Sequence, residues 1–77
     1  MPTYTVTLKL VHSAQRALED AQLHLYAPSG ESVTLVREDS NVATFALALN
    51  EGEYTAEEWA SEWAESIAAE LVSVTHA

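Results

Sequence analysis

Polar and apolar residues alternate along much of the chain, and this pattern predicts β-strands. In residues 3–10, apolar side chains occupy the even positions, while threonines and Lys9 occupy the odd ones. A period of two is typical of a strand with one buried face. Similar patterns predict further strands at 21–27, 32–38 and 42–49.

Two turn signals separate the last three of these predicted strands. Pro28-Ser29-Gly30 precedes the strand at 32–38, and Glu38-Asp39-Ser40-Asn41 follows it. Short turns between successive strands predict an antiparallel meander, to which the first strand adds a fourth member. Residues 12–20 lack alternation, and we expect a loop with helical character there, in which Ser13 could cap a turn or two of helix.

The strongest periodic signal lies near residue 60. Thr55-Ala56-Glu57-Glu58 has the form of a capping box, in which the first and last side chains bond to each other's backbone N–H groups. Apolar residues then recur at three- and four-residue steps, which predicts an amphipathic helix from about 56 to 70. The apolar stripe consists of Ala56, Trp59, Ala60, Trp63, Ala64, Ile67 and Leu71.

After this helix the pattern is ambiguous, because residues 71–75 could continue it or form a short closing strand. With 77 residues, the chain is expected to be a single compact domain. The predicted architecture is α+β: an antiparallel four-stranded sheet (a strand, a loop and a three-stranded meander) packed by one C-terminal amphipathic helix.

The net charge of the chain excludes some classes of binding partner. Twelve acidic residues against three Lys and Arg give a formal net charge of −9. Because three cations cannot neutralise a row of phosphates, we expect no direct binding to nucleic acid and no attraction to anionic membranes. The chain has no cysteine, and its beginning lacks the pattern of a signal peptide, so we expect a cytoplasmic protein.

The acidic residues are unevenly distributed. Residues 39–77 contain eight Asp and Glu but no Lys or Arg. Four of these acids fall on the side of the predicted helix opposite to its apolar stripe: Glu57, Glu58, Glu62 and Glu65. Like charges at this spacing destabilise an isolated helix. The row is therefore either an ordinary solvated surface or a surface that binds a positively charged partner.

The residues predicted to bind a partner follow from this helix. Trp63 lies near the centre of the apolar stripe and is expected in the core. Trp59 lies at the edge of the stripe, where it either packs in the core or is partly exposed as an interface anchor. The predicted partner-binding residues are Glu57, Glu58, Glu62 and Glu65, flanked by Glu51, Glu53 and Glu70, together with Trp59.

The sequence offers little for catalysis or metal binding. His12, His24 and His76 lack the spacing of a zinc site, and no loop resembles a calcium loop. The two glycines, Gly30 and Gly52, both fall in predicted turns, so no glycine-rich phosphate loop is present. We expect no enzymatic activity, no cofactor and no specific metal site.

In size, charge and lack of catalytic motifs, the chain resembles the small acidic proteins that phages use against host defence, such as anti-CRISPR and anti-restriction inhibitors and other DNA mimics. This general resemblance transfers no residue, but it implies an inhibitor that occupies the nucleic-acid-binding site of a basic protein or ribonucleoprotein complex. Two alternatives remain: an interaction subunit or antitoxin-like module that binds through a strand edge or Trp59, or acidity that only solvates the surface or adapts it to salt.

Overall fold

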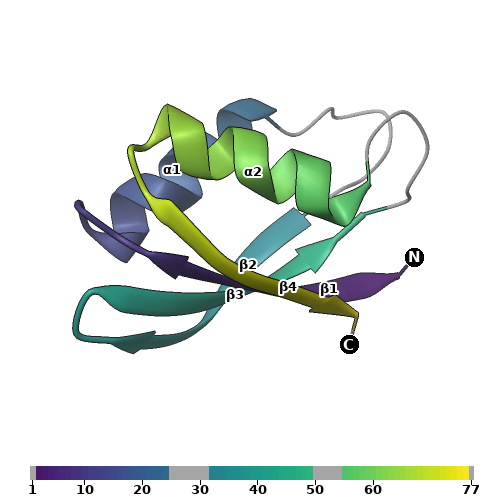
Figure 1. Cartoon of the computed structure of the whole chain (residues 1–77), viewed down its shortest axis with the longest axis horizontal. Helices are drawn as coiled ribbons and strands as arrows, with labels where there is room; N and C mark the ends of the chain where they lie inside the picture. Colours follow the sequence, from purple (N-terminus) through teal and green to yellow (C-terminus); the bar gives the residue numbers. More distant parts are fainter. Residues whose placement is uncertain (1, 25–31, 50–54, 77) are drawn as a thin grey trace.

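The computed structural model describes residues 2–24, 32–49 and 55–76, which contain two helices and four strands (Figure 1). In chain order these are β1 (Thr3–Lys9), α1 (Ala14–His24), β2 (Ser32–Asp39), β3 (Val42–Ala48), α2 (Ala56–Ser66) and β4 (Glu70–His76). The strands form an antiparallel sheet in the order β2-β3-β1-β4. This arrangement is the ferredoxin-like, or split βαβ, topology.

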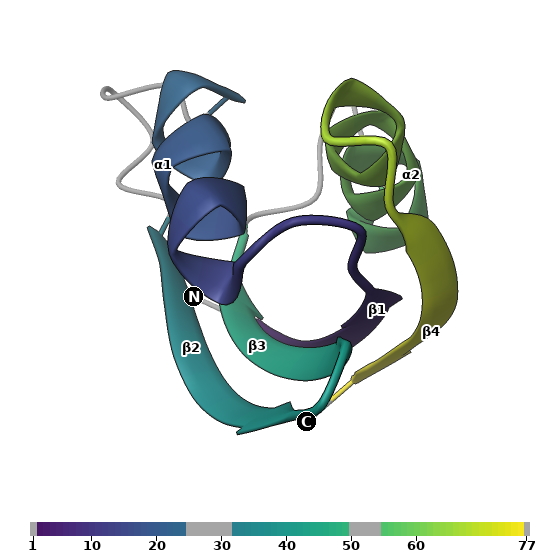
Figure 2. The same cartoon turned by 90° about the vertical axis from the view of Figure 1, so that its left-hand side faces the viewer.

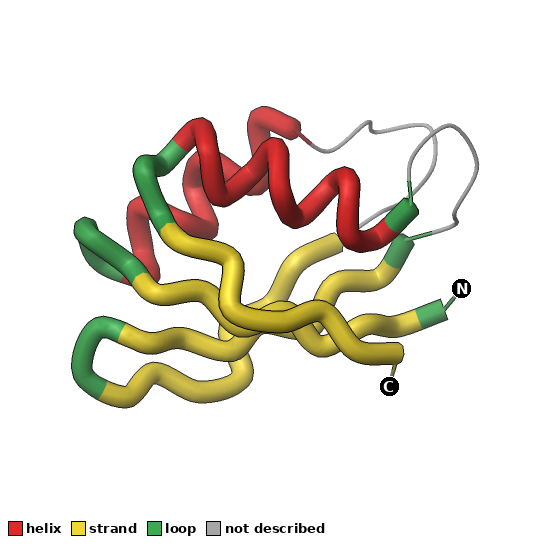
Figure 3. The backbone as a smooth tube through the Cα atoms, viewed as in Figure 1, coloured by secondary structure: helices red, strands yellow, loops and turns green. Residues whose placement is uncertain are grey.

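Both helices lie on the same face of the sheet (Figure 3). Seen end-on, the sheet is curved, with its concave side toward the helices; α1 lies on the β2 side and α2 on the β4 side (Figure 2). We call the two helices the helical layer, and the other side of the sheet the open face. On the two central strands, the open face carries Thr3, Thr5, Thr7, Lys9, Val42, Thr44, Ala46 and Ala48.

The hydrophobic core lies between the sheet and the helical layer. The alternation in β1 and β3 places every second side chain there, so Val6, Leu8, Phe45 and Leu47 have no exposed surface. Leu49, which follows β3, also belongs to this core. All these side chains form one cluster with the apolar stripe of α2, so the sheet and helices share a single core.

Trp63 is the largest fully buried side chain in the core. Its ring makes an edge-to-face contact with Phe45, with centroids 4.9 Å apart. Its indole N–H donates a 2.9 Å hydrogen bond to the backbone carbonyl of Ala17 in α1. A second bond joins the helices, because the Ser66 hydroxyl donates to the Asp20 carboxylate. Trp63 therefore connects α2 to both the sheet and α1.

Most of the predicted architecture is confirmed. The protein is α+β with an antiparallel four-stranded sheet, and the hairpin of residues 32–49 and the amphipathic helix with its capping box are present. Residues 71–75 belong to strand β4. The helix ends at Ser66, before the predicted residue 70, and Ala68 then adopts a left-handed conformation (φ 55°) that turns the chain into β4.

The segment before β2 differs from the prediction made from the sequence. Residues 14–24 form α1, where the sequence predicted a loop followed by the start of a strand at residue 21. The prediction that Ser13 caps a helix is confirmed, because its hydroxyl accepts a 3.3 Å hydrogen bond from the N–H of Arg16. The rest of the predicted strand, at 25–27, and the turn at 28–30 lie outside the described residues. The strand that completes the four-stranded sheet is β4, for which the sequence left a strand as one of two alternatives.

Each edge strand of the sheet contains an irregularity. The pairing of β2 with β3 shifts between Leu35 and Arg37, and that of β4 with β1 shifts between Leu71 and Ser73. The residues at these two bulges, Val36 and Val72, are 64% and 57% exposed. Bulges on edge strands hinder uncontrolled pairing with other sheets.

Candidate functional site

The acidic row begins at the first turn of α2, where the sequence fixes the start of the helix. The Thr55 hydroxyl accepts a 3.2 Å hydrogen bond from the N–H of Glu58, and the Glu58 carboxylate accepts a 3.1 Å bond from the N–H of Thr55. This reciprocal capping box satisfies two N–H groups that would otherwise lack partners. Glu58 therefore has a structural role in addition to its charge.

The side of α2 that faces away from the core carries a series of exposed carboxylates. Glu57, Glu58, Glu62 and Glu65 are all exposed, while Ala56, Trp59, Ala60, Trp63 and Ala64 are buried. Residues three and four apart on a helix have Cβ atoms about 5–6 Å apart, so the last three glutamates lie in one row. The sequence-based prediction that these four residues share an exposed side of the helix is confirmed.

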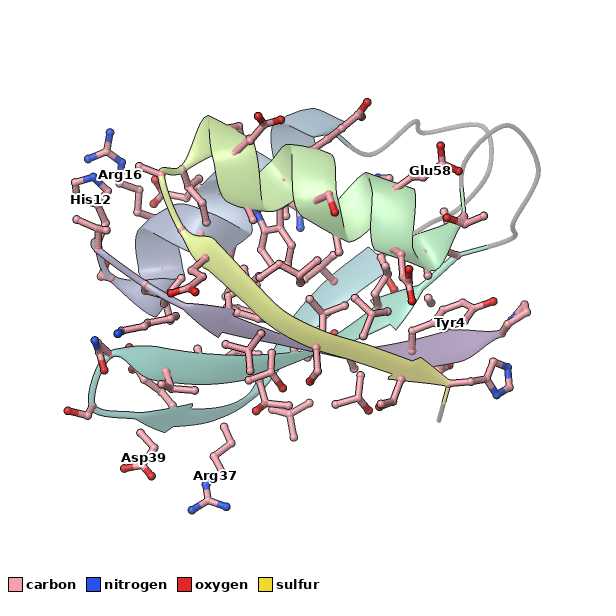
Figure 4. All side chains as sticks on the ribbon, viewed as in Figure 1. Tyr4, His12, Arg16, Arg37, Asp39 and Glu58 are labelled. Atoms are coloured by element: carbon pink, nitrogen blue, oxygen red, sulfur yellow. The ribbon has the colours of Figure 1, made fainter. Side chains whose placement is uncertain are left out.

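Helix α1 adds to this acidic surface. Glu19 is exposed and Asp20 is partly exposed, and α1 lies beside α2 in the helical layer (Figure 2). The two helices together carry six carboxylates and a single Lys or Arg, Arg16. Arg16 lies at the opposite end of the helical layer from Glu58 (Figure 4). We use the name acidic surface for Glu19, Asp20, Glu57, Glu58, Glu62 and Glu65.

The contribution of α1 was missed in the sequence, although a signal for it was present. Ala14, Ala17, Leu18 and Ala21 recur at helical spacing, and this pattern would have placed Glu19 on an exposed side. Alanines give only a weak hydrophobic signal, so the alternation that begins at residue 21 is the stronger pattern in the sequence.

The other basic residues lie away from the acidic surface. Lys9 is paired in register with Glu70 on the open face. Arg37 forms an ion pair with Asp39 at 3.8 Å, and both side chains point away from the helical layer (Figure 4). These two pairs give the open face equal numbers of acidic and basic groups. The charge of the described part is therefore concentrated on the helical side.

The remaining predicted partner-binding residues have different outcomes. Trp59 is only 4% exposed and packs against Trp63, so of its two predicted positions the structure shows the one in the core and not the partly exposed anchor: the apolar stripe is wide enough to bury both indoles. Glu70 is exposed but lies on β4 beside Lys9, apart from the row on α2. Glu51 and Glu53 lie outside the described residues.

The histidines are scattered over the described structure. His12 is exposed before α1, His24 lies in α1, and the exposed His76 lies on β4 with its ring 5.0 Å from that of Tyr4. In the part of the chain that the structure describes, no three His, Asp or Glu side chains are grouped so that they could hold a metal ion. The helices described are too short and too polar to cross a membrane.

A shallow cleft lies between the first turn of α2 and the end of β4. Its volume is about 350 Å³, and we call it the β4 cleft. It is lined by Tyr4, Thr55, Ala56, Glu57, Val74 and His76. Glu57 thus extends the acidic surface down to the edge of the sheet.

We compared the chain with protein-family models, with curated proteins and with solved structures. None of them matches it, so the fold, the acidic surface and the β4 cleft are the basis for assigning a function.

Proposed function

We propose that this protein is a non-catalytic inhibitor that binds a basic site on a partner through its acidic surface. The partner is a basic protein or a ribonucleoprotein complex, and the site is one that otherwise binds nucleic acid. In this respect the protein would act like a small phage DNA mimic or anti-CRISPR protein. Such partners place the protein in the cytoplasm.

One observation carries this proposal: the carboxylates of α2 gather on its exposed side without interleaved cations, and the one cation of the helical layer, Arg16, lies on α1 beside Glu19 and Asp20. Glu62 has Glu58 and Glu65 as helical neighbours, and no Lys or Arg occurs in α2. Repulsion within such a row costs stability, so selection for folding alone would favour mixed charges. A basic partner would relieve this repulsion.

Salt adaptation explains the distribution less well. General adaptation would spread acids over the whole surface, but the charged pairs of the open face balance each other. An acidic row instead suits electrostatic steering, in which complementary fields speed encounter and fix orientation. Binding through it should weaken steeply as salt rises.

The test is affinity capture from a lysate of the source organism, with two variants of equal net charge. Glu62→Gln/Glu65→Gln removes two carboxylates from the centre of the acidic surface, and Glu38→Gln/Asp39→Asn removes the two carboxylates of β2. Both leave the Glu58 capping bond intact. We expect the β2 variant to retain the partner captured by the wild type, and the α2 variant to lose it.

Duplex DNA and salt provide the second part of this test. A partner held at its nucleic-acid-binding site should be released by added DNA and by a rise from about 0.05 to 0.5 M salt. Equal capture by the two variants, or a partner that DNA does not displace, would show that the acidic surface does not act as a nucleic-acid decoy.

A further inference from the structure

Strand β4 forms one edge of the sheet. Its register partner is β1, and the described residues place no strand on its other side. An edge strand presents backbone N–H and C=O groups that can pair with an added strand. Five of its seven residues are exposed: Glu70, Val72, Ser73, Thr75 and His76.

The half of β4 beyond its bulge is regular. Residues 73–76 pair in unbroken register with residues 7–4 of β1. Regular pairing on the inner side holds this stretch extended, so its outward backbone groups lie in the geometry of an antiparallel ladder. The stretch is long enough to pair with a segment of about four residues.

The β4 cleft lies directly beside this regular stretch. Val74 and His76 line it from β4, and Glu57 in the first turn of α2 supplies a carboxylate. A side chain of an added strand that pointed toward the helical layer would meet this cleft. Its surroundings favour a long cationic side chain, whose methylene groups would lie along Val74 while its charge approaches Glu57.

Charge distinguishes this edge from the other one. Residues 55–76 contain five glutamates and no Lys or Arg. At the other edge, strand β2 and helix α1 together carry four acids and two arginines, so the negative charge there is smaller and partly paired. A second copy of the chain would bring two acidic α2 helices together, because α2 lies on the β4 side of the sheet (Figure 2).

We propose that the edge of β4 binds an extended, basic segment of the protein partner, as an added antiparallel strand with a Lys or Arg side chain in the β4 cleft. This inference rests on the proposed function for the charge of the partner. It adds the conformation of the bound segment and a second contact surface on the protein.

The probe is a blocked heptapeptide of alternating Lys and Val, titrated into the ¹⁵N-labelled protein to millimolar concentration. We expect the largest amide shifts at Ser73–His76 and in the first turn of α2. Two control peptides separate the causes of binding. One replaces each Lys with Glu, and the other keeps every Lys but carries a methyl group on each backbone nitrogen.

The methylated peptide should bind at least about tenfold more weakly, because it cannot donate ladder hydrogen bonds. The Glu peptide should not bind. In the protein, Glu57→Gln should weaken binding of the Lys peptide about fivefold, while Glu38→Gln, of equal net charge, should leave it unchanged. Thermal unfolding of both variants checks that the fold is intact.

Three results would overturn the inference: no amide shift in β4, equal binding of the methylated peptide, or amide shifts confined to the row of Glu58, Glu62 and Glu65 on α2. The last two would leave the proposed function standing, because charge alone would then attract the peptide. Concentration-dependent shifts in β4 without peptide would instead identify a second copy as the occupant. If the lysate capture failed but the peptide still bound to β4, only the proposal that the acidic surface acts as a nucleic-acid decoy would be rejected.

Discussion

At the scale of single residues, Trp63 shows how one side chain determines the position of two helices. It belongs to α2, contacts Phe45 of the sheet and donates a hydrogen bond to Ala17 of α1. The sequence predicted its burial from the helical period. The acceptor could not be predicted, because a bond between residues 46 positions apart depends on the tertiary fold.

Replacing Trp63 with Phe should lower the free energy of unfolding by about 2–3 kcal/mol. The change removes core volume and leaves the Ala17 carbonyl without its indole donor. Urea denaturation measures the loss, with Trp59→Phe as control. Trp59 has no hydrogen bond to α1 among the described contacts, so its variant should lose about 1 kcal/mol less. Equal losses would show that the hydrogen bond contributes little.

The capping box gives a second prediction at this scale. Thr55→Ala removes the acceptor for the Glu58 N–H and should cost about 1 kcal/mol. Glu58→Gln retains an oxygen acceptor for the Thr55 N–H and should cost less. Chemical denaturation compares the two, and a larger loss for Glu58→Gln would assign the stabilisation to its charge at the helix start.

At the scale of elements, α1 depends on packing more than on its own helical preference. It has eleven residues, a length at which an isolated helix is marginal in water. Its buried side is formed by Ala14, Ala17 and Ala21, which allow close approach to the core. This explains why α1 was not predicted: small apolar side chains mark a helix only once its neighbours are known.

Enlarging this contact should therefore destabilise the protein. Ala21→Leu places three extra carbon atoms in a site without exposed surface and should cost about 1–3 kcal/mol. The neighbouring residue Gln22 is exposed, so Gln22→Leu should change stability by less than about 0.5 kcal/mol. Thermal unfolding of the pair tests the packing, and similar melting temperatures would contradict it.

The strands show a different limit of sequence reasoning. Local alternation identified β1, β2 and β3, and the short turn identified the β2–β3 hairpin. The pairing of β1 with β3 and β4 connects residues far apart in sequence, so no turn signal reports it. The strand order β2-β3-β1-β4 is visible only in the structure.

At the scale of the whole molecule, charge is separated between the helical layer and the open face. Only the acidic row on α2 could be predicted from the sequence, because it follows from helical spacing alone. The contribution of Glu19 and Asp20 required α1 and its position beside α2. The neutrality of the open face required the strand register that pairs Lys9 with Glu70.

This separation predicts that salt stabilises the protein by screening repulsion in the helical layer. Glu62→Lys replaces two repulsive helical neighbours with attractive ones, and should raise stability by about 0.5–1 kcal/mol at about 10 mM salt. Urea unfolding should show half that gain for Glu62→Gln and almost none for either variant at about 0.5 M salt. A gain that persists at high salt would reflect helix propensity instead of charge.

The central position of β1 also affects how the protein folds during synthesis. β1 is made before the other five described elements, and its neighbours β3 and β4 follow tens of residues later. Until then both edges of β1 lack their partners in the sheet, and pairing must wait for closure of long loops. The sheet can therefore be completed only after β4, the last of the described elements, has been made.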